Sequence, residues 1–141
     1  MHKQFAQEQT LIDISKAIQR DLQGIADVYR EAGYGAPVHH DDTLIVAKAA
    51  GRIIGVVRLC TEEDVVVLRG MQIQKAFQRQ GIGARLLQAC LPYLEHRQAF
   101  CLPYVHLIPF YSAVNFEVVS GADLPDFLAQ RLASYLDKGQ Q

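Results

Sequence analysis

The segment 78–84 combines residue types and spacing that predict a specific chemistry. Its sequence is Gln-Arg-Gln-Gly-Ile-Gly-Ala, with glycines at positions 81 and 83. It follows a predicted strand and precedes the strongest predicted helix, whose first backbone N–H groups have no partners within the helix. Glycine lets a phosphate approach the backbone closely, and the helix dipole adds about half a positive charge. The pattern predicts a diphosphate-binding loop, with a tight turn that packs the helix as the alternative.

Two common nucleotide-binding motifs do not fit this loop. The Walker loop requires G-x-x-x-x-G-K-[ST], and the Rossmann fingerprint requires three spaced glycines after a strand. The segment 78–84 has neither arrangement. ATP and NAD are therefore disfavoured as ligands.

Hydrophobic periodicity and turn residues predict the elements that position this loop. We expect a strand at 10–17 and an amphipathic helix that runs from an N-cap at Asp21 to a stop at Gly33. Consecutive antiparallel strands are predicted at 44–49, 53–60 and 65–74, followed by a helix over 81–95. The remaining predictions are a strand at 99–104, a short helix at 110–114, a strand at 116–119 and a last helix over 123–138, capped by Asp123. The fold class is α/β (α+β mixed), a mostly antiparallel mixed sheet flanked by helices in a single domain, 1–141.

Composition and charge exclude several classes of function. The 141 residues are 50% hydrophobic and 21% charged, with a net charge of -1. This balance provides no long-range field for nucleic acid, and the apolar runs fall short of the roughly 20 residues of a membrane span. Residues 1–9 are expected to be a flexible N-terminus without a secretory signal, which predicts a cytoplasmic protein. The cysteines at 60, 90 and 101 lack metal-site spacing and are expected to be buried and reduced.

Two segments resemble the GNAT superfamily of acetyl-CoA-dependent N-acetyltransferases. Gln-x-x-Gly-x-Gly after a strand is similar to that family's pyrophosphate loop, and Tyr111–Phe116 resembles its Y-x-x-x-G-F signature, with Asn115 in place of the glycine. The resemblance covers about residues 10–120 in element order. It implies acetyl-CoA (CoA) as the cofactor, with these binding residues: Met71, Gln72, Ile73, Gln78, Arg79, Gln80, Gly81, Ile82, Gly83, Ala84 and Tyr111.

The resemblance also implies roles in acetyl transfer. A backbone N–H of the strand segment 71–73, from Ile73 or its neighbour, would bind the oxyanion, and Tyr111 would protonate the departing thiolate. Core packing is the alternative for Tyr111. The glutamate that many members place on this strand is absent, since Val67 occupies its position. His106 is the candidate base, with a helix-packing role as the alternative, and no metal is expected.

The acceptor is predicted to be a primary amine of a small molecule or peptide. By resemblance, the segment after the first helix covers the acceptor site, which directs attention to Tyr29, Tyr34, His39, His40, Asp41 and Asp42. Residues 39–42 could instead be a solvated loop or, less readily, a metal cluster, because adjacent ligands on one loop rarely converge.

The sequence thus predicts an N-acetyltransferase that works by direct attack in a ternary complex. An acyl-CoA sensor or scaffold without turnover is the alternative, because Val67 stands where a base is often found. The apolar stripe of the last helix would suit either a homodimer contact or closure of the core.

Overall fold

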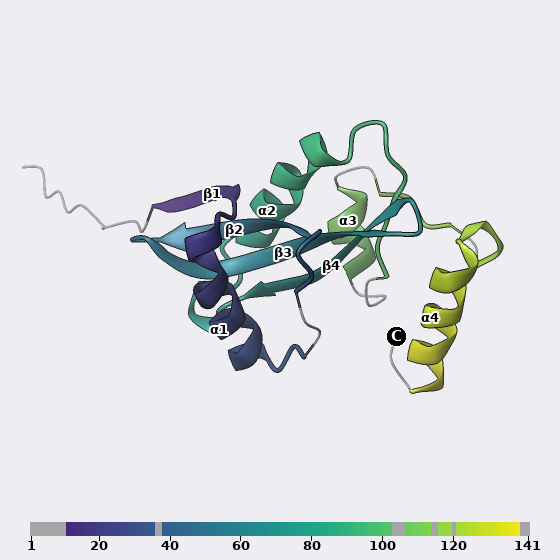
Figure 1. The fold of residues 1–141 in the computed structure, drawn as a ribbon, viewed down its shortest axis with the longest axis horizontal. Helices are drawn as coiled ribbons and strands as arrows, with labels where there is room; N and C mark the ends of the chain where they lie inside the picture. Colours follow the sequence, from purple (N-terminus) through teal and green to yellow (C-terminus); the bar gives the residue numbers. More distant parts are fainter. Residues whose placement is uncertain (1–10, 36–37, 103–106, 114–115, 120, 139–141) are drawn as a thin grey trace, which may run out of the picture. The chain divides into compact units, whose positions relative to one another are not determined.

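The structure is a computed structural model that describes residues 11–35, 38–102, 107–113, 116–119 and 121–138 (Figure 1). The chain forms two compact units, Met1–Ala99 and Phe100–Gln141. The predicted flexible N-terminus, 1–9, lies outside the described residues.

The first unit is built around an antiparallel sheet. Its elements are β1 (Ile12–Lys16), α1 (Leu22–Ala32), β2 (Thr43–Ala49), β3 (Arg52–Glu62), β4 (Val65–Ile73) and α2 (Ile82–Cys90). The strand order is β1-β2-β3-β4-β5, and β5 is the short strand Ala99–Phe100. Pairing is antiparallel from β1 through β4. The predicted mixed α+β fold and the three consecutive antiparallel strands are confirmed.

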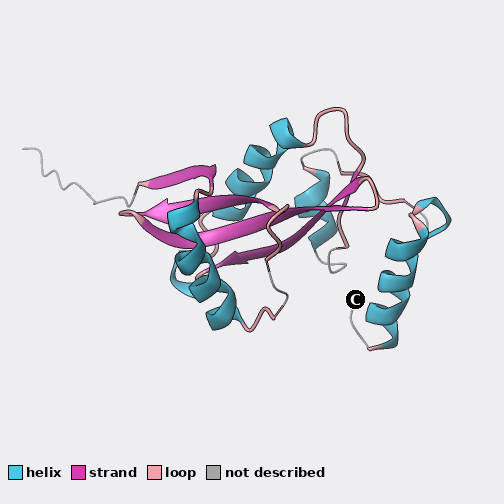
Figure 2. Ribbon diagram, in the orientation of Figure 1, coloured by secondary structure: helices cyan, strands magenta, loops and turns pink. Residues whose placement is uncertain are grey.

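Helices α1 and α2 lie on opposite faces of this sheet (Figures 1 and 2). The α1 face contains a cluster of buried apolar side chains, with these members: Ile25, Val28, Tyr29, Leu44, Val46 and Val56. Neighbouring strand residues point to opposite faces, so Ile45 and Val57 point toward the α2 face. Helix α2 buries its own apolar stripe: Ile82, Leu86, Leu87 and Cys90. The predicted amphipathic helices therefore each bury one face on the sheet.

Two details of the first unit differ from the sequence prediction. Helix α2 ends at Cys90 instead of residue 95, because Pro92 lies in the following 3-10 turn and cannot continue an α-helical hydrogen-bond ladder. Asp21 is the N-cap residue of α1, but its side chain does not cap that helix. Its carboxylate instead accepts from the Ile18 N–H at 2.9 Å and pairs with Lys48 Nζ at 2.9 Å. Gly33 ends α1 in the left-handed conformation, as predicted, with φ 71°.

The second unit contains α3 (Ile108–Ser112) and α4 (Asp126–Asp137). The predicted strand 116–119 is wrong, since these residues have no regular secondary structure and Val118 is 73% exposed. The last helix begins at Asp126 with Pro125 as its N-cap residue, so Asp123 does not cap it and instead ends a preceding 3-10 turn, Gly121–Asp123. The predicted strand 99–104 is also too long, because Cys101 and Leu102 are irregular.

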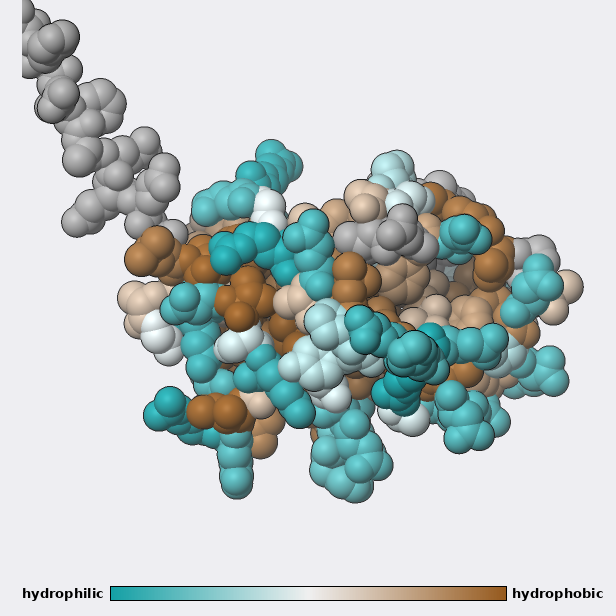
Figure 3. All heavy atoms as spheres, turned by 90° about the horizontal axis from the view of Figure 1, so that it is seen from above, coloured by the Kyte–Doolittle hydropathy of each residue, from teal (hydrophilic) through white to brown (hydrophobic). Residues whose placement is uncertain are grey.

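Hydrophilic and hydrophobic surface are mixed on the face shown in Figure 3. No helix among the described residues is long and apolar enough to cross a membrane. Cys60 and Cys90 are buried free thiols, as predicted, whereas Cys101 is half-buried. Burial raises the pKa of Cys60 to about 11 and that of Cys90 to about 12, which keeps both thiols protonated and unreactive.

Candidate active site

Strand β4 contains a bulge at Gly70 and Met71. Val56 and Arg58 of β3 pair with residues 72 and 69, so the two bulge residues lie opposite Val57 alone. Gly70 has φ 65°, in the left-handed region that glycine adopts without strain. A glycine in this conformation at the first position of a bulge bends the strand and redirects the residues that follow.

The bulge sets the direction of the backbone amides at the end of β4. The Gln74 N–H donates to the Ile54 carbonyl of β3 at 2.8 Å. Successive backbone amides in a strand point to alternate sides. The Ile73 N–H group therefore points away from β3, whereas the Gln72 N–H points toward it. Of the predicted donors in segment 71–73, Ile73 can offer a backbone N–H group on that side, while Met71 lies in the bulge itself.

A polar network lies beneath the bulge on the α1 face. Arg58 donates to Asp42 Oδ2 from Nε at 3.1 Å and from Nη2 at 2.8 Å, and to Tyr34 Oη from Nη1 at 3.1 Å. The Tyr29 hydroxyl donates to the Gly70 carbonyl at 2.7 Å. The Arg58 and Asp42 side chains are each 4% exposed, so this ion pair is desolvated. Burial raises the pKa of Tyr29, which keeps its hydroxyl a donor.

The network packs directly against Gly70. A Cβ at this position would lie 2.9 Å from the Tyr29 hydroxyl, 3.0 Å from the Tyr34 hydroxyl and 3.1 Å from Arg58 Cδ. Sequence reasoning did not identify Arg58 or Gly70 as important. The available signal was a single arginine within the apolar strand 53–60, since an arginine on a buried strand requires a partner.

The loop before α2 has the geometry of an anion site. Gly81 is the N-cap residue, with φ 79°, and no side chain caps the helix. The N–H groups of the first turn, residues 82–84, therefore need partners from water or a ligand. A Cβ added at Gly81 would meet nothing within 4 Å, so the approach is open. The Gln78 side chain donates to the Ile73 carbonyl at 2.9 Å and links the loop to β4.

The two predicted catalytic side chains are not placed relative to this loop. Tyr111 is buried in α3 of the second unit, where its ring packs edge-on against Phe110 and Phe116 at centroid distances of 5.1 and 5.9 Å. His106 lies outside the described residues. Their roles stay predictions. Val67 is 2% exposed in β4 and carries no titratable group.

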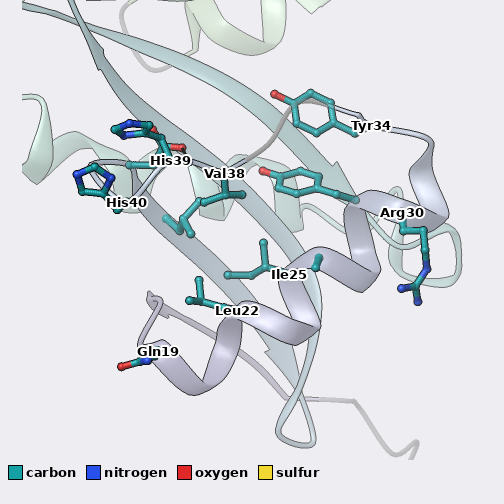
Figure 4. Close-up of a pocket in the computed structure, with 12 residues that line it drawn as sticks. Gln19, Leu22, Ile25, Arg30, Tyr34, Val38, His39 and His40 are labelled. Carbon is teal, nitrogen blue, oxygen red and sulfur yellow. Dashed lines mark hydrogen bonds between the residues drawn. The ribbon is translucent and has the colours of Figure 1, made fainter.

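A pocket of about 920 Å³ lies along α1 (Figure 4). It is lined by Gln19, Leu22, Ile25, Ala26, Tyr29, Arg30, Tyr34, Val38, His39, His40, Asp42 and Leu44. Every predicted acceptor-site residue except Asp41 is in this lining. Asp41 is exposed, and its carboxylate and the imidazoles of His39 and His40 have ligand atoms within 4.8 Å of one another. The apolar members 22, 25 and 26 were missed, although their helical spacing with Tyr29 places them together.

Comparison with known proteins identifies the family. A family model for the acetyltransferase (GNAT) domain matches residues 40–118, more than half of the chain. The chain belongs to the GNAT acetyltransferase family. The match includes β2 to β4, the bulge and the loop before α2. No curated protein sequence matches this GNAT chain.

Solved structures show the same GNAT fold at low sequence identity. A GNAT family acetyltransferase from Streptococcus pneumoniae is 22% identical with a TM-score of 0.64, covering 82% of this chain and 94% of that chain. Glucosamine-6-phosphate N-acetyltransferase from Arabidopsis thaliana is 12% identical with a TM-score of 0.65, covering 78% and 94%. An aminoglycoside N-acetyltransferase in complex with CoA is 16% identical with a TM-score of 0.64, covering 82% and 94%.

Proposed function

We propose that this GNAT protein transfers an acetyl group from acetyl-CoA to a primary amine of a small molecule or peptide, by direct attack in a ternary complex. The observation that carries the proposal is the uncapped N-terminus of α2 after Gly81, in a loop that the Gln78 to Ile73 hydrogen bond joins to the end of β4. Family membership and the CoA found in a similar structure support the same cofactor.

The residues present fit the cofactor. The first-turn N–H groups of α2, at 82–84, would hold the diphosphate, and the open approach at Gly81 leaves room for it. Met71 and Ile73 would donate backbone hydrogen bonds to the extended arm and the acyl carbonyl. Bound acetyl-CoA supplies the acetyl group as a reactive thioester.

The protein's own groups then supply binding and proton transfer. A backbone N–H fixed in β4 is suited to stabilise an oxyanion, because the strand holds it in place before the charge develops. Tyr111 is proposed as the proton donor to the thiolate, and His106 as the base that takes the proton from the amine. The Tyr111 assignment rests on the family resemblance, and the His106 assignment rests on the chemistry of an imidazole and on its place in the sequence before Tyr111.

The second candidate function is acyl-CoA binding without turnover. Many GNAT members have a glutamate at the strand position that Val67 occupies here. Val67 is buried, with 2% of its surface exposed, and provides no carboxylate. A sensor or scaffold of this kind would retain the loop geometry and the affinity for CoA. It would release no thiol in the presence of amines.

Calorimetric titration with acetyl-CoA, followed by thiol release against an amine panel, tests the proposal. The decisive variant is Gly81→Asp, which places a carboxylate at the helix N-terminus and should weaken acetyl-CoA binding at least about 10-fold through charge repulsion. Gly51→Asp is the matched control, because Gly51 has φ 78° and equally open space around its added Cβ. Both variants carry the same backbone strain, so only the loop variant should lose affinity.

The outcomes separate the candidate functions. Binding with thiol release supports the acetyltransferase, and binding without release on any amine supports the sensor. Absence of acetyl-CoA binding in the wild-type protein, or equal loss in both glycine variants, contradicts the assigned site.

A further inference from the structure

We propose that the pocket along α1 binds the acceptor, and that the acceptor is a monoamine with an apolar body, either alkyl or arylalkyl. This inference rests on the proposed function, since it names the substrate class of the same reaction. It is carried by the lining of the pocket, by its position beside the β4 bulge, and by the pairing of its carboxylate.

The centre of the pocket is apolar. Ile25 and Leu44 form its buried floor. Leu22 and Val38 line it while remaining 45% and 37% exposed, so their apolar surface is open to a ligand. Figure 4 shows Leu22, Ile25 and Val38 grouped between α1 and the segment that carries the two histidines. An apolar body placed here gains about 25 cal/mol for each Å² of apolar surface removed from water.

One end of the pocket adjoins the proposed acetyl site. Tyr29 and Tyr34 line the pocket, with ring centroids 4.6 Å apart. The Tyr29 hydroxyl donates to the Gly70 carbonyl, within the β4 bulge that also contains Met71. An amine at the tyrosine end would therefore lie against the two tyrosines that contact β4 at Gly70, while its body extends toward Leu22.

The charges of the lining do not match a polycation. Asp42 is the single carboxylate among the lining residues that the structure describes. Its Oδ2 accepts hydrogen bonds from Arg58 and from the His39 N–H, each at 2.8 Å. The charge of Asp42 is therefore already paired within the protein. Arg30 points away from Leu22, Ile25 and Val38 (Figure 4). Outside the lining, the exposed Asp41 carboxylate lies 3.7 Å from His39 Nδ1 and 3.2 Å from His40 Nε2. A polyamine or aminoglycoside would therefore meet a solvated carboxylate beside the histidines but no uncommitted one in the lining, whereas one amine on an apolar body needs no counter-charge beyond the reacting end.

An apolar pocket also favours the reactive form of the acceptor. Removing an ammonium group from water disfavours the charged state and lowers the pKa of the bound amine. The neutral amine is the nucleophile, so burial supplies part of what a strand carboxylate would supply. This matters here because β4 carries Val67 at that position.

The direct test is a chain-length series. Thiol release is measured with n-propylamine to n-hexylamine and with phenethylamine, against spermidine and glucosamine, at saturating acetyl-CoA. We expect kcat/KM to rise about fourfold for each added methylene. Phenethylamine should exceed spermidine and glucosamine. A flat series, or a preference for spermidine, overturns the inference.

Two phenylalanine variants on α1 locate the effect. Ala26→Phe fills the pocket from an exposed helix position, and Ala32→Phe is the matched control on the same helix, outside the lining. The first variant should flatten the chain-length series, and the second should leave it unchanged. Equal behaviour of the two variants overturns the assignment to this pocket.

A binding readout keeps this inference separate from turnover. Phenethylamine is titrated into ¹⁵N-labelled protein without acetyl-CoA, and the amide signals of Ile25, Tyr34 and Leu44 are followed. Saturable shifts at these amides, weakened by Ala26→Phe, support the pocket even if no thiol is released, in which case the proposed transferase activity fails and the site stands. No shift at these amides overturns the inference even if other amines are acetylated.

Discussion

The two faces of the sheet are stabilised in different ways. The α2 face is sealed by aliphatic side chains and a thiol, with Leu86, Leu87 and Cys90 fully buried. The α1 face begins with a similar apolar cluster around Ile25 but changes to a polar network toward Gly70. The two faces differ most at the bulge. Packing alone does not require a glycine in the left-handed conformation within a strand.

This difference separates stability from positioning. Apolar packing tolerates exchange of one aliphatic side chain for another of similar volume. A buried arginine bound to a carboxylate and a hydroxyl requires each partner in one geometry. The α1 face can therefore fix the conformation of the bulge, and with it the direction of the β4 amides.

The largest effect should come from breaking the buried ion pair. Arg58→Met leaves Asp42 without its cation in a desolvated site, and we expect a loss of about 3–5 kcal/mol in the free energy of unfolding. Denaturant unfolding measures it. The double variant Arg58→Met with Asp42→Leu should recover much of this loss, because no unpaired charge remains. A single-variant loss below about 1 kcal/mol, the range of exposed pairs, would contradict the desolvated network.

A variant on the α2 face sharpens the comparison. Leu86→Ala removes a fully buried side chain and should cost about 2–5 kcal/mol through lost burial and a cavity. The amide signals of Gly70 and Met71 should stay in place in this variant and shift in Arg58→Met. If Leu86→Ala shifts the Gly70 and Met71 amide signals as much as Arg58→Met does, the polar network on the α1 face does not specifically fix the bulge.

A smaller, pH-dependent effect is expected at the start of α1. Burial would raise the pKa of Asp21, but the Ile18 N–H and Lys48 outweigh it and hold this pKa below its ordinary value. The carboxylate therefore contributes stability above the unfolded-state pKa of about 3.9, and that contribution is lost as the pH falls through the lower folded pKa. Asp21→Asn should destabilise the protein at pH 5–7.

Unfolding at pH 7, 5 and 3 checks this sign. The difference between wild type and Asp21→Asn should be constant from pH 7 to 5 and shrink at pH 3. A difference that grows toward low pH would show that the carboxylate is stabilised in its protonated form. In a Lys48→Met background, the loss of stability caused by Asp21→Asn should be smaller but still present, since the Ile18 hydrogen bond to Asp21 remains.

Local sequence patterns predicted well those elements that depend only on residues close by in the sequence. The stripe of α2 and the stop at Gly33 required no knowledge of distant residues. The strand 116–119 failed because a short β-branched run says nothing about whether a neighbouring strand is available to pair with it.

The site was predicted only in part, for the same reason. Two glycines after a strand indicated the loop before α2. The Arg58 to Asp42 pair joins residues on different segments, and the bulge at Gly70 appears only when the register with β3 is known. The pocket likewise forms between α1 and segment 38–42, which hydrophobic periodicity alone cannot bring together.

The measurement that tests the central claim most directly is a titration of ¹⁵N-labelled protein with CoA, followed through the backbone amides. We predict saturable shifts at Ile82, Gly83 and Ala84, together with Met71 and Ile73, and their loss in Gly81→Asp but not in Gly51→Asp. Saturable shifts confined to other parts of the chain, or none at millimolar CoA, would contradict the assignment of the loop before α2 and the edge of β4 as the cofactor site.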